Sequence, residues 1–233
     1  WDVDPEAAFV FDVLVQLGTL VAVVIYFWTD LMQMLRSTLR AAIARRRTGD
    51  AHLRLAWLVV LGTIPAVAAG LLLKPVVEAA FGSPAAVAVF LLVTAGLLLG
   101  AERFGRPAAP LESATWIDAL WVGLAQALSI FPGISRSGST IAAGLTRGLQ
   151  RTAAARFSFL LSIPVMIGAG LVAGLDLAAL PGAAAYVPTV LVGFVAAAVV
   201  GYLSIRWLLA FVSRHSLTVF SLYCLAAGVA GLL

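Results

Sequence analysis

Six apolar runs of about 17–22 residues limit what this chain can fold into, because each can cross a hydrocarbon core of roughly 30 Å as a helix. They cover residues 9–28, 55–73, 85–101, 157–175, 186–205 and 216–233. The composition agrees, since 62% of the residues are hydrophobic and only 11% are charged, unlike a soluble domain. The runs also lack the short alternating pattern of barrel strands. We therefore predict an all-α polytopic membrane protein.

The basic residues lie almost entirely on one predicted side of the membrane. If the segment after the first run is inside, and residues 114–149 return to the side from which they enter, thirteen of the fifteen Lys and Arg residues face that side, as the positive-inside rule expects. These thirteen are Arg36, Arg40, Arg45, Arg46, Arg47, Arg54, Arg103, Arg106, Arg147, Arg151, Arg156, Arg206 and Arg214. Topology thus explains most of the net charge of +4, and no nucleic-acid partner is expected. Residues 30–47 place leucines four apart opposite arginines, which predicts an amphipathic surface helix.

Phe131–Thr140 is a polar, turn-forming segment within apolar sequence, and it holds the cation Arg136 that topology does not explain. The apolar residues 114–131 precede it, and residues 139–149 are predicted to form a short helix. At about 1.5 Å per residue this second leg is too short to cross a bilayer. We therefore predict a re-entrant helix-loop-helix, since non-helical backbone at membrane depth must be buried in protein or line a cavity.

The residue types of this loop suit a phosphate group. A guanidinium away from water costs at least ~2.5–3.5 kcal/mol, which bidentate hydrogen bonds from Arg136 to phosphate would offset. Pro132 and Gly133 break the first helix and free backbone N–H groups. The N-terminus of the returning helix, capped by Ser137 or Ser139, would also attract an anion.

Simpler alternatives exist both for the polar residues of the first apolar run and for the Phe131–Thr140 loop. Asp12 and Gln16 are four residues apart and share a helix face. They would form either a second shell around the polar cavity or a simple hydrogen bond between packed helices. In the simplest alternative for the loop, its small residues only pack helices closely and Arg136 pairs with Asp12.

The loop and the first run carry a resemblance to a known family. Residues 127–140, Ala-Leu-Ser-Ile-Phe-Pro-Gly-Ile-Ser-Arg-Ser-Gly-Ser-Thr, resemble the second signature of the undecaprenyl-diphosphatase (bacitracin-resistance) family, Pro-Gly-x-Ser-Arg-Ser-x-x-Thr. Phe11-Asp-Val-Leu-Val-Gln-Leu-Gly18 resembles the first full span of that family.

The resemblance implies an enzyme that removes the terminal phosphate of a polyprenyl diphosphate, which recycles the lipid carrier of cell-wall synthesis and confers bacitracin resistance. It implies two inverted repeats, here residues 1–113 and 114–233, and a divalent cation, Mg²⁺ or Ca²⁺. It also implies a multi-pass protein of the bacterial inner membrane whose active site faces outward.

The resemblance assigns roles to residues of the loop. Arg136 would clamp the diphosphate, Ser135 and Thr140 would bind phosphate oxygens, and these three are the expected catalytic residues. Further substrate-binding positions are Gly133, Ser137, Gly138 and Ser139. The sequence does not decide which group attacks phosphorus.

The family's first signature, with two glutamates followed by Pro-x-Ser-Ser-x-Gly-His, would precede Trp1 and does not occur in these 233 residues. In the family that signature belongs to the first re-entrant hairpin, which we therefore also do not expect within these residues. We expect no metal ligands within this chain and no catalysis by these residues alone.

Two other classes share features with this sequence. Phosphatidic-acid-phosphatase-type enzymes also use a Ser-Arg pair but need a histidine a few residues later, and residues 139–149 contain none. A lipid transporter or flippase would share the inverted repeats and re-entrant hairpins. Phosphate release separates an enzyme from a transporter.

Overall fold

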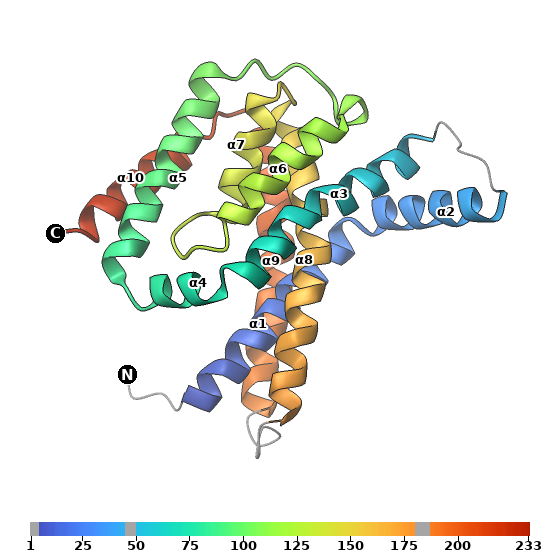
Figure 1. Ribbon diagram of the computed structural model, residues 1–233. Coiled ribbons are helices and arrows are strands. Elements are labelled where there is room, and N and C mark those ends of the chain that lie inside the picture. Colours follow the sequence, from blue (N-terminus) through green and yellow to red (C-terminus); the bar gives the residue numbers. More distant parts are fainter. Residues whose placement is uncertain (1–4, 45–49, 180–186) are drawn as a thin grey trace. The chain divides into compact units, whose positions relative to one another are not determined.

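The computed structural model describes residues 5–44, 50–179 and 187–233, which form ten α-helices and one 3₁₀ turn and contain no strand (Figure 1). This confirms the all-α class. The helices are α1 (Pro5–Tyr26), α2 (Trp28–Ala44), α3 (Ala51–Leu72), α4 (Lys74–Phe81), α5 (Pro84–Phe104), α6 (Trp116–Leu128), α7 (Arg136–Thr146), α8 (Arg151–Ala179), α9 (Val187–Val212) and α10 (Thr218–Ala230).

Several helices are long and apolar enough to span a membrane. Four qualify within the described residues, and a fifth does if α1 and α2 on either side of Phe27 count as one broken span. The four are Ala51–Leu72, Pro84–Phe104, Arg151–Val172 and Leu191–Val212. Their outward side chains include large apolar groups such as Trp57 and Leu171, which are more than 60% exposed. A polytopic membrane protein is therefore confirmed, although α10 has only 13 residues and is shorter than the predicted run.

The chain divides into two compact units. The first comprises Trp1–Gln33 and Ser162–Leu208, and the second comprises Met34–Leu161 and Leu209–Leu233. In the first unit α1 packs closely on α9, since a Cβ at Gly18 would lie 2.4 Å from the carbonyl oxygen of Phe194. The predicted inverted repeats, residues 1–113 and 114–233, stay a prediction.

The second unit holds the Phe131–Thr140 loop. Here α3 packs on α6, α6 on α7, α7 on α5, and α5 on α10 (Figure 1). Small residues allow the closest crossing: a Cβ at Gly123 of α6 would lie 2.3 Å from the carbonyl oxygen of Gly62 in α3. Close backbone approach at small residues is typical of packed membrane helices. The α6–α7 pair is therefore supported on both sides, by α3 and by α5.

Two predictions about connecting segments have different outcomes. The amphipathic helix is confirmed as α2, on which Leu35, Leu39 and Ile43 are exposed. The absence of an apolar run at residues 74–83 predicts a short loop between the second and third runs. This is wrong, because α4 forms there with Pro75 in its first turn, where a missing N–H costs no helix hydrogen bond. An eight-residue helix is too short to show as an apolar run.

Candidate functional site at the α6–α7 loop

Helices α6 and α7 form an antiparallel hairpin joined by residues 129–135. Near the loop the hydroxyl of Ser139 lies 3.2 Å from the carbonyl oxygen of Ala125, and at the other end Trp121 Nε1 donates to Thr146 Oγ1 at 3.1 Å. With 13 and 11 residues, the two helices rise only about 20 and 16 Å. Both are too short to cross a bilayer, which supports the predicted re-entrant hairpin.

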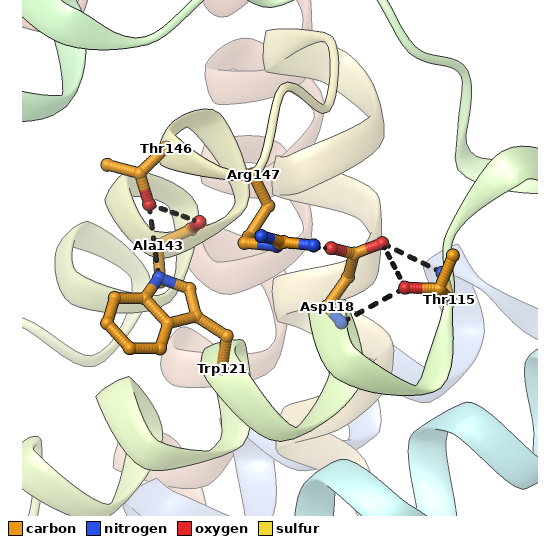
Figure 2. A network of polar contacts seen from close by, with 6 residues as sticks. All are labelled: Thr115, Asp118, Trp121, Ala143, Thr146 and Arg147. Atoms are coloured by element: carbon orange, nitrogen blue, oxygen red, sulfur yellow. Dashed lines mark hydrogen bonds and ion pairs between the residues drawn. The ribbon is translucent and has the colours of Figure 1, made fainter.

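The end of the hairpin far from the loop is held by a polar network (Figure 2). Arg147 Nε donates to Asp118 Oδ1 at 2.6 Å, and the other carboxylate oxygen accepts from the N–H and the hydroxyl of Thr115, both at 2.8 Å. Thr115 and Asp118 also form a capping box at the start of α6. The Asp118 carboxylate therefore caps the start of α6 and also links α6 to Arg147, the residue directly after α7.

The loop itself follows a path that requires glycine at one position. Gly133 has φ +96°, and a Cβ there would lie 2.3 Å from the carbonyl oxygen of Val87 in α5. Thr94 of the same helix is fully buried, and its Oγ1 accepts a hydrogen bond from the N–H of Ser135 at 3.1 Å. The loop therefore packs directly against α5.

Ser135 begins α7. Its side chain accepts from the N–H of Gly138 at 3.1 Å, and its own backbone is extended. The prediction that Ser137 or Ser139 caps this helix is therefore wrong: the helix begins earlier, at Arg136, and ends at Thr146. Gly138 is buried against the Ser135 side chain, where a Cβ would lie 3.0 Å from the serine Oγ.

Arg136 and Ser137 present unused donors immediately after the cap. Among the described residues, neither the guanidinium of Arg136, nor the hydroxyl of Ser137, nor the backbone N–H of either residue has a hydrogen-bond partner. The Arg136 side chain is exposed and Ser137 is half-buried. Guanidinium, N–H and hydroxyl groups at a helix N-terminus are what an anion requires.

The next two hydroxyls of α7 point into the protein. Ser139 is 1% exposed, and Thr140 is fully buried with its hydroxyl 2.6 Å from that of Ser158 in α8 and 2.7 Å from the carbonyl oxygen of Arg136. The predicted phosphate contacts of Ser139 and Thr140 stay predictions. In the structure both hydroxyls already have hydrogen-bond partners, and these contacts stabilise the first turns of α7.

The remaining predicted residues lie elsewhere. Gln16 is exposed on α1 in the first compact unit, and the Asp12 side chain is outside the described residues, so their second-shell role stays a prediction. Within the described ranges no group of three His, Cys, Asp or Glu side chains could hold a metal ion.

Sequence reasoning missed four supporting residues. They are Thr94, Ser158, Asp118 and Arg147, polar residues inside or beside apolar runs. A polar residue in such a place is expected to have a hydrogen-bond partner, but the sequence does not show which residue that partner is. Gln126 of α6 is another such residue. It is 1% exposed, and neither atom of its amide has a partner among the described residues.

Comparison with known proteins agrees with this geometry. Residues 2–230 match the family described as bacitracin resistance protein BacA. A protein of Methanosphaera stadtmanae named undecaprenyl-diphosphatase is 40% identical over 233 residues, which cover 96% of this chain and 83% of that protein. Undecaprenyl-diphosphatases of Desulforudis audaxviator and Rubrobacter xylanophilus are 42% and 45% identical over 220 and 226 residues, or 94% and 96% of this chain and 80% and 83% of theirs.

These matches cover almost the whole chain, including α6, the loop and α7, and they confirm the resemblance that rests on residues 127–140. The chain belongs to the bacitracin resistance protein BacA family.

Proposed function

We propose that this protein is an undecaprenyl-diphosphatase, a hydrolase that cleaves the terminal phosphate from a polyprenyl diphosphate. The observation that carries the proposal is the set of donors at the start of α7 that have no partner within residues 5–44, 50–179 and 187–233: the Arg136 guanidinium, the Ser137 hydroxyl and two backbone N–H groups. The family membership and the names of the relatives support the same substrate class.

The chemistry follows from where the donors lie. The reaction breaks the anhydride bond between the terminal phosphorus and the bridging oxygen, adds water across it, and yields a polyprenyl monophosphate and inorganic phosphate. Negative charge shifts onto the bridging oxygen as that bond breaks. Arg136 would hold phosphate oxygens through its planar fork, and the N–H groups of Arg136 and Ser137 would stabilise the charge that develops.

Ser135 can cap α7 and still contact the substrate, because its Oγ accepts from the Gly138 N–H through a lone pair. Its hydroxyl hydrogen remains available to a phosphate oxygen. Ser139 and Thr140 would keep the backbone of Arg136 and Ser137 in place, since both lie near the carbonyl oxygen of Arg136.

The divalent cation predicted from the resemblance is not supported by the loop. Its groups are N–H, guanidinium and hydroxyl donors, which suit an anion, whereas Mg²⁺ and Ca²⁺ prefer carboxylate and carbonyl oxygens. We assign no step of the reaction to a metal.

We propose that the loop opens toward the outer face of the bacterial inner membrane. Arg106 and Arg147 lie near the opposite end of the hairpin from Arg136: Arg147 directly follows the last residue of α7, and the carbonyl oxygen of Arg106 lies near Gly148. If those arginines face the inner side, as the charge distribution predicts, the loop points away from it. A lipid diphosphate whose head group lies outside would then meet Arg136.

The test is phosphate release from undecaprenyl diphosphate by the purified full-length protein in detergent. Arg136→Lys should lose nearly all activity, because an ammonium group cannot form the bidentate contact. Arg106→Lys is the matched control, since Arg106 is also exposed and has no partner among the described residues; it should keep wild-type turnover.

Wild-type turnover in Arg136→Lys would exclude Arg136 as the clamp. A wild-type protein that moves the lipid across a membrane but never releases phosphate would favour a transporter instead.

A further inference from the structure

Thr94 contacts the loop through its hydroxyl group, and its methyl group faces Gly138. Its Oγ1 accepts from the Ser135 N–H at 3.1 Å. The one hydroxyl hydrogen has two acceptors within reach, the carbonyl oxygen of Gly133 in the loop at 3.2 Å and that of Phe90 in α5 at 3.1 Å. A Cβ at Gly138 would lie 3.4 Å from the Thr94 methyl group. A single buried residue of α5 therefore contacts the loop at Gly133 and at Ser135, the residue that caps α7, and its methyl group limits the space beside Gly138.

The contact reaches the anion-binding groups through a short series of bonds. Thr94 holds the N–H of Ser135, Ser135 holds the N–H of Gly138, and Arg136 and Ser137 lie between these two anchored positions. The N–H groups of Arg136 and Ser137, which have no partner in the described part of the chain, are thus carried by a backbone segment fixed at both ends. Because Thr94 lies 41 residues away on another helix, it can fix where that segment stands relative to α5.

We propose that Thr94 is a positioning residue of the reaction: its hydroxyl sets the place of the Arg136–Ser137 donors against the diphosphate. The proposal rests on the proposed function for the chemistry and on the Thr94 contacts for the geometry. Thr94 touches no substrate itself. It acts through Ser135, and its effect is on the alignment of donors that matter most in the transition state.

The hydroxyl can be separated from the packing by two substitutions. Thr94→Val keeps the shape and the methyl group but leaves the Ser135 N–H without its acceptor. Thr94→Ser keeps the hydroxyl and removes the methyl group. Ser221→Ala is the matched control, because Ser221 of α10 is equally buried and its hydroxyl donates to the carbonyl oxygen of Ala95, the residue after Thr94, at 2.7 Å.

Steady-state hydrolysis of undecaprenyl diphosphate by the full-length protein should show a split between kcat and KM. Thr94→Val should lower kcat by on the order of 10²-fold, the effect of a small misplacement of catalytic groups, with a smaller change in KM. Thr94→Ser should restore most of kcat, and Ser221→Ala should stay within about threefold of the wild type. A purely structural role would lower the thermal midpoint and the amount of folded Thr94→Val protein, but would leave kcat and KM per folded molecule unchanged.

Binding of inorganic pyrophosphate, measured by calorimetry, supplies a readout that does not depend on turnover. Thr94→Val should weaken pyrophosphate binding, and Thr94→Ser and Ser221→Ala should not. If the wild type binds pyrophosphate and Thr94→Val weakens that binding, but no variant releases phosphate, the proposed function fails while Thr94 still positions an anion site. If the wild type is active and Thr94→Val matches it in both kcat and pyrophosphate affinity, the Thr94 proposal is overturned and the proposed function stands.

Discussion

Gly133 shows at the scale of one residue why the loop tolerates little change. Its φ of +96° is one that residues with a Cβ rarely adopt, and the space a Cβ would fill is taken by the carbonyl oxygen of Val87 and the Cβ of Phe90. The strain and the clash act together, because relieving the clash would move the backbone away from α5. The same movement would draw Ser135 away from Thr94.

Gly133→Ala should therefore lower both stability and activity. Backbone strain of this kind costs roughly 1–3 kcal/mol, and phosphate release should fall because the donors after Ser135 shift. Thermal unfolding in detergent and the phosphate assay measure the two effects.

Gly96→Ala is the matched control on the same helix as Thr94, since nothing lies within 4 Å of a Cβ built at Gly96. Alanine there should be neutral or stabilising by up to about 1 kcal/mol, from helix propensity alone. A Gly133→Ala protein as stable and active as Gly96→Ala would contradict the proposed backbone constraint.

At the scale of elements, side-chain contacts join α6 and α7 at the end of the hairpin far from the 129–135 loop. The Asp118 side chain is 8% exposed and Arg147 is 41% exposed, so the ion pair joins a buried partner to a partly solvated one. Trp121 adds a second link to Thr146 on the same side (Figure 2). Closing this end fixes the angle of α7 and hence the direction of the loop.

A double-mutant cycle of Asp118→Asn and Arg147→Gln tests this closure. The coupling free energy should fall within roughly 0.5–3 kcal/mol, toward the lower end because water reaches Arg147. Each single variant should also lower the thermal midpoint, since it leaves one charged partner without the other. Arg106→Gln controls for the loss of an exposed arginine that has no ion-pair partner among the residues the structure describes, and it should change stability by no more than about 0.5 kcal/mol. Additive effects of the two variants would show that the ion pair does not hold the hairpin.

At the scale of the whole molecule, the charge distribution predicts which loops face which side. Gly82, between α4 and α5, should face outward, and Glu112, between α5 and α6, should face inward with the arginines. Both residues are exposed, so a cysteine at either position can be labelled.

Gly82→Cys and Glu112→Cys, each in a Cys224→Ser background, should therefore react differently with a maleimide that does not cross membranes. Gly82→Cys should be labelled in intact cells, and Glu112→Cys only in inverted vesicles. The native Cys224 is buried, and its replacement removes residual background. Labelling of both positions from the same side would overturn the topology and the outward direction of the loop.

The local sequence was sufficient for the class of fold, for the charge asymmetry and for the loop with Arg136. Apolar runs predict membrane helices because crossing the bilayer requires length and hydrophobicity, which are properties of a segment. The same reasoning missed α4, whose eight residues are too few to form a run, and placed the start of α7 a few residues too late. Several serines in succession can each cap a helix, and the choice of Ser135 depends on contacts from α5.

Which hydroxyls of the loop remain free was decided only by the tertiary structure. The sequence alone makes Ser135, Ser137, Ser139 and Thr140 equal candidates for a phosphate. Packing against α8 buries Thr140 beside Ser158, and packing against α6 directs Ser139 to Ala125, which leaves Arg136 and Ser137 outward. The physical reason is that a buried polar group must find a partner, and these partners lie on helices 14 to 41 residues away along the chain.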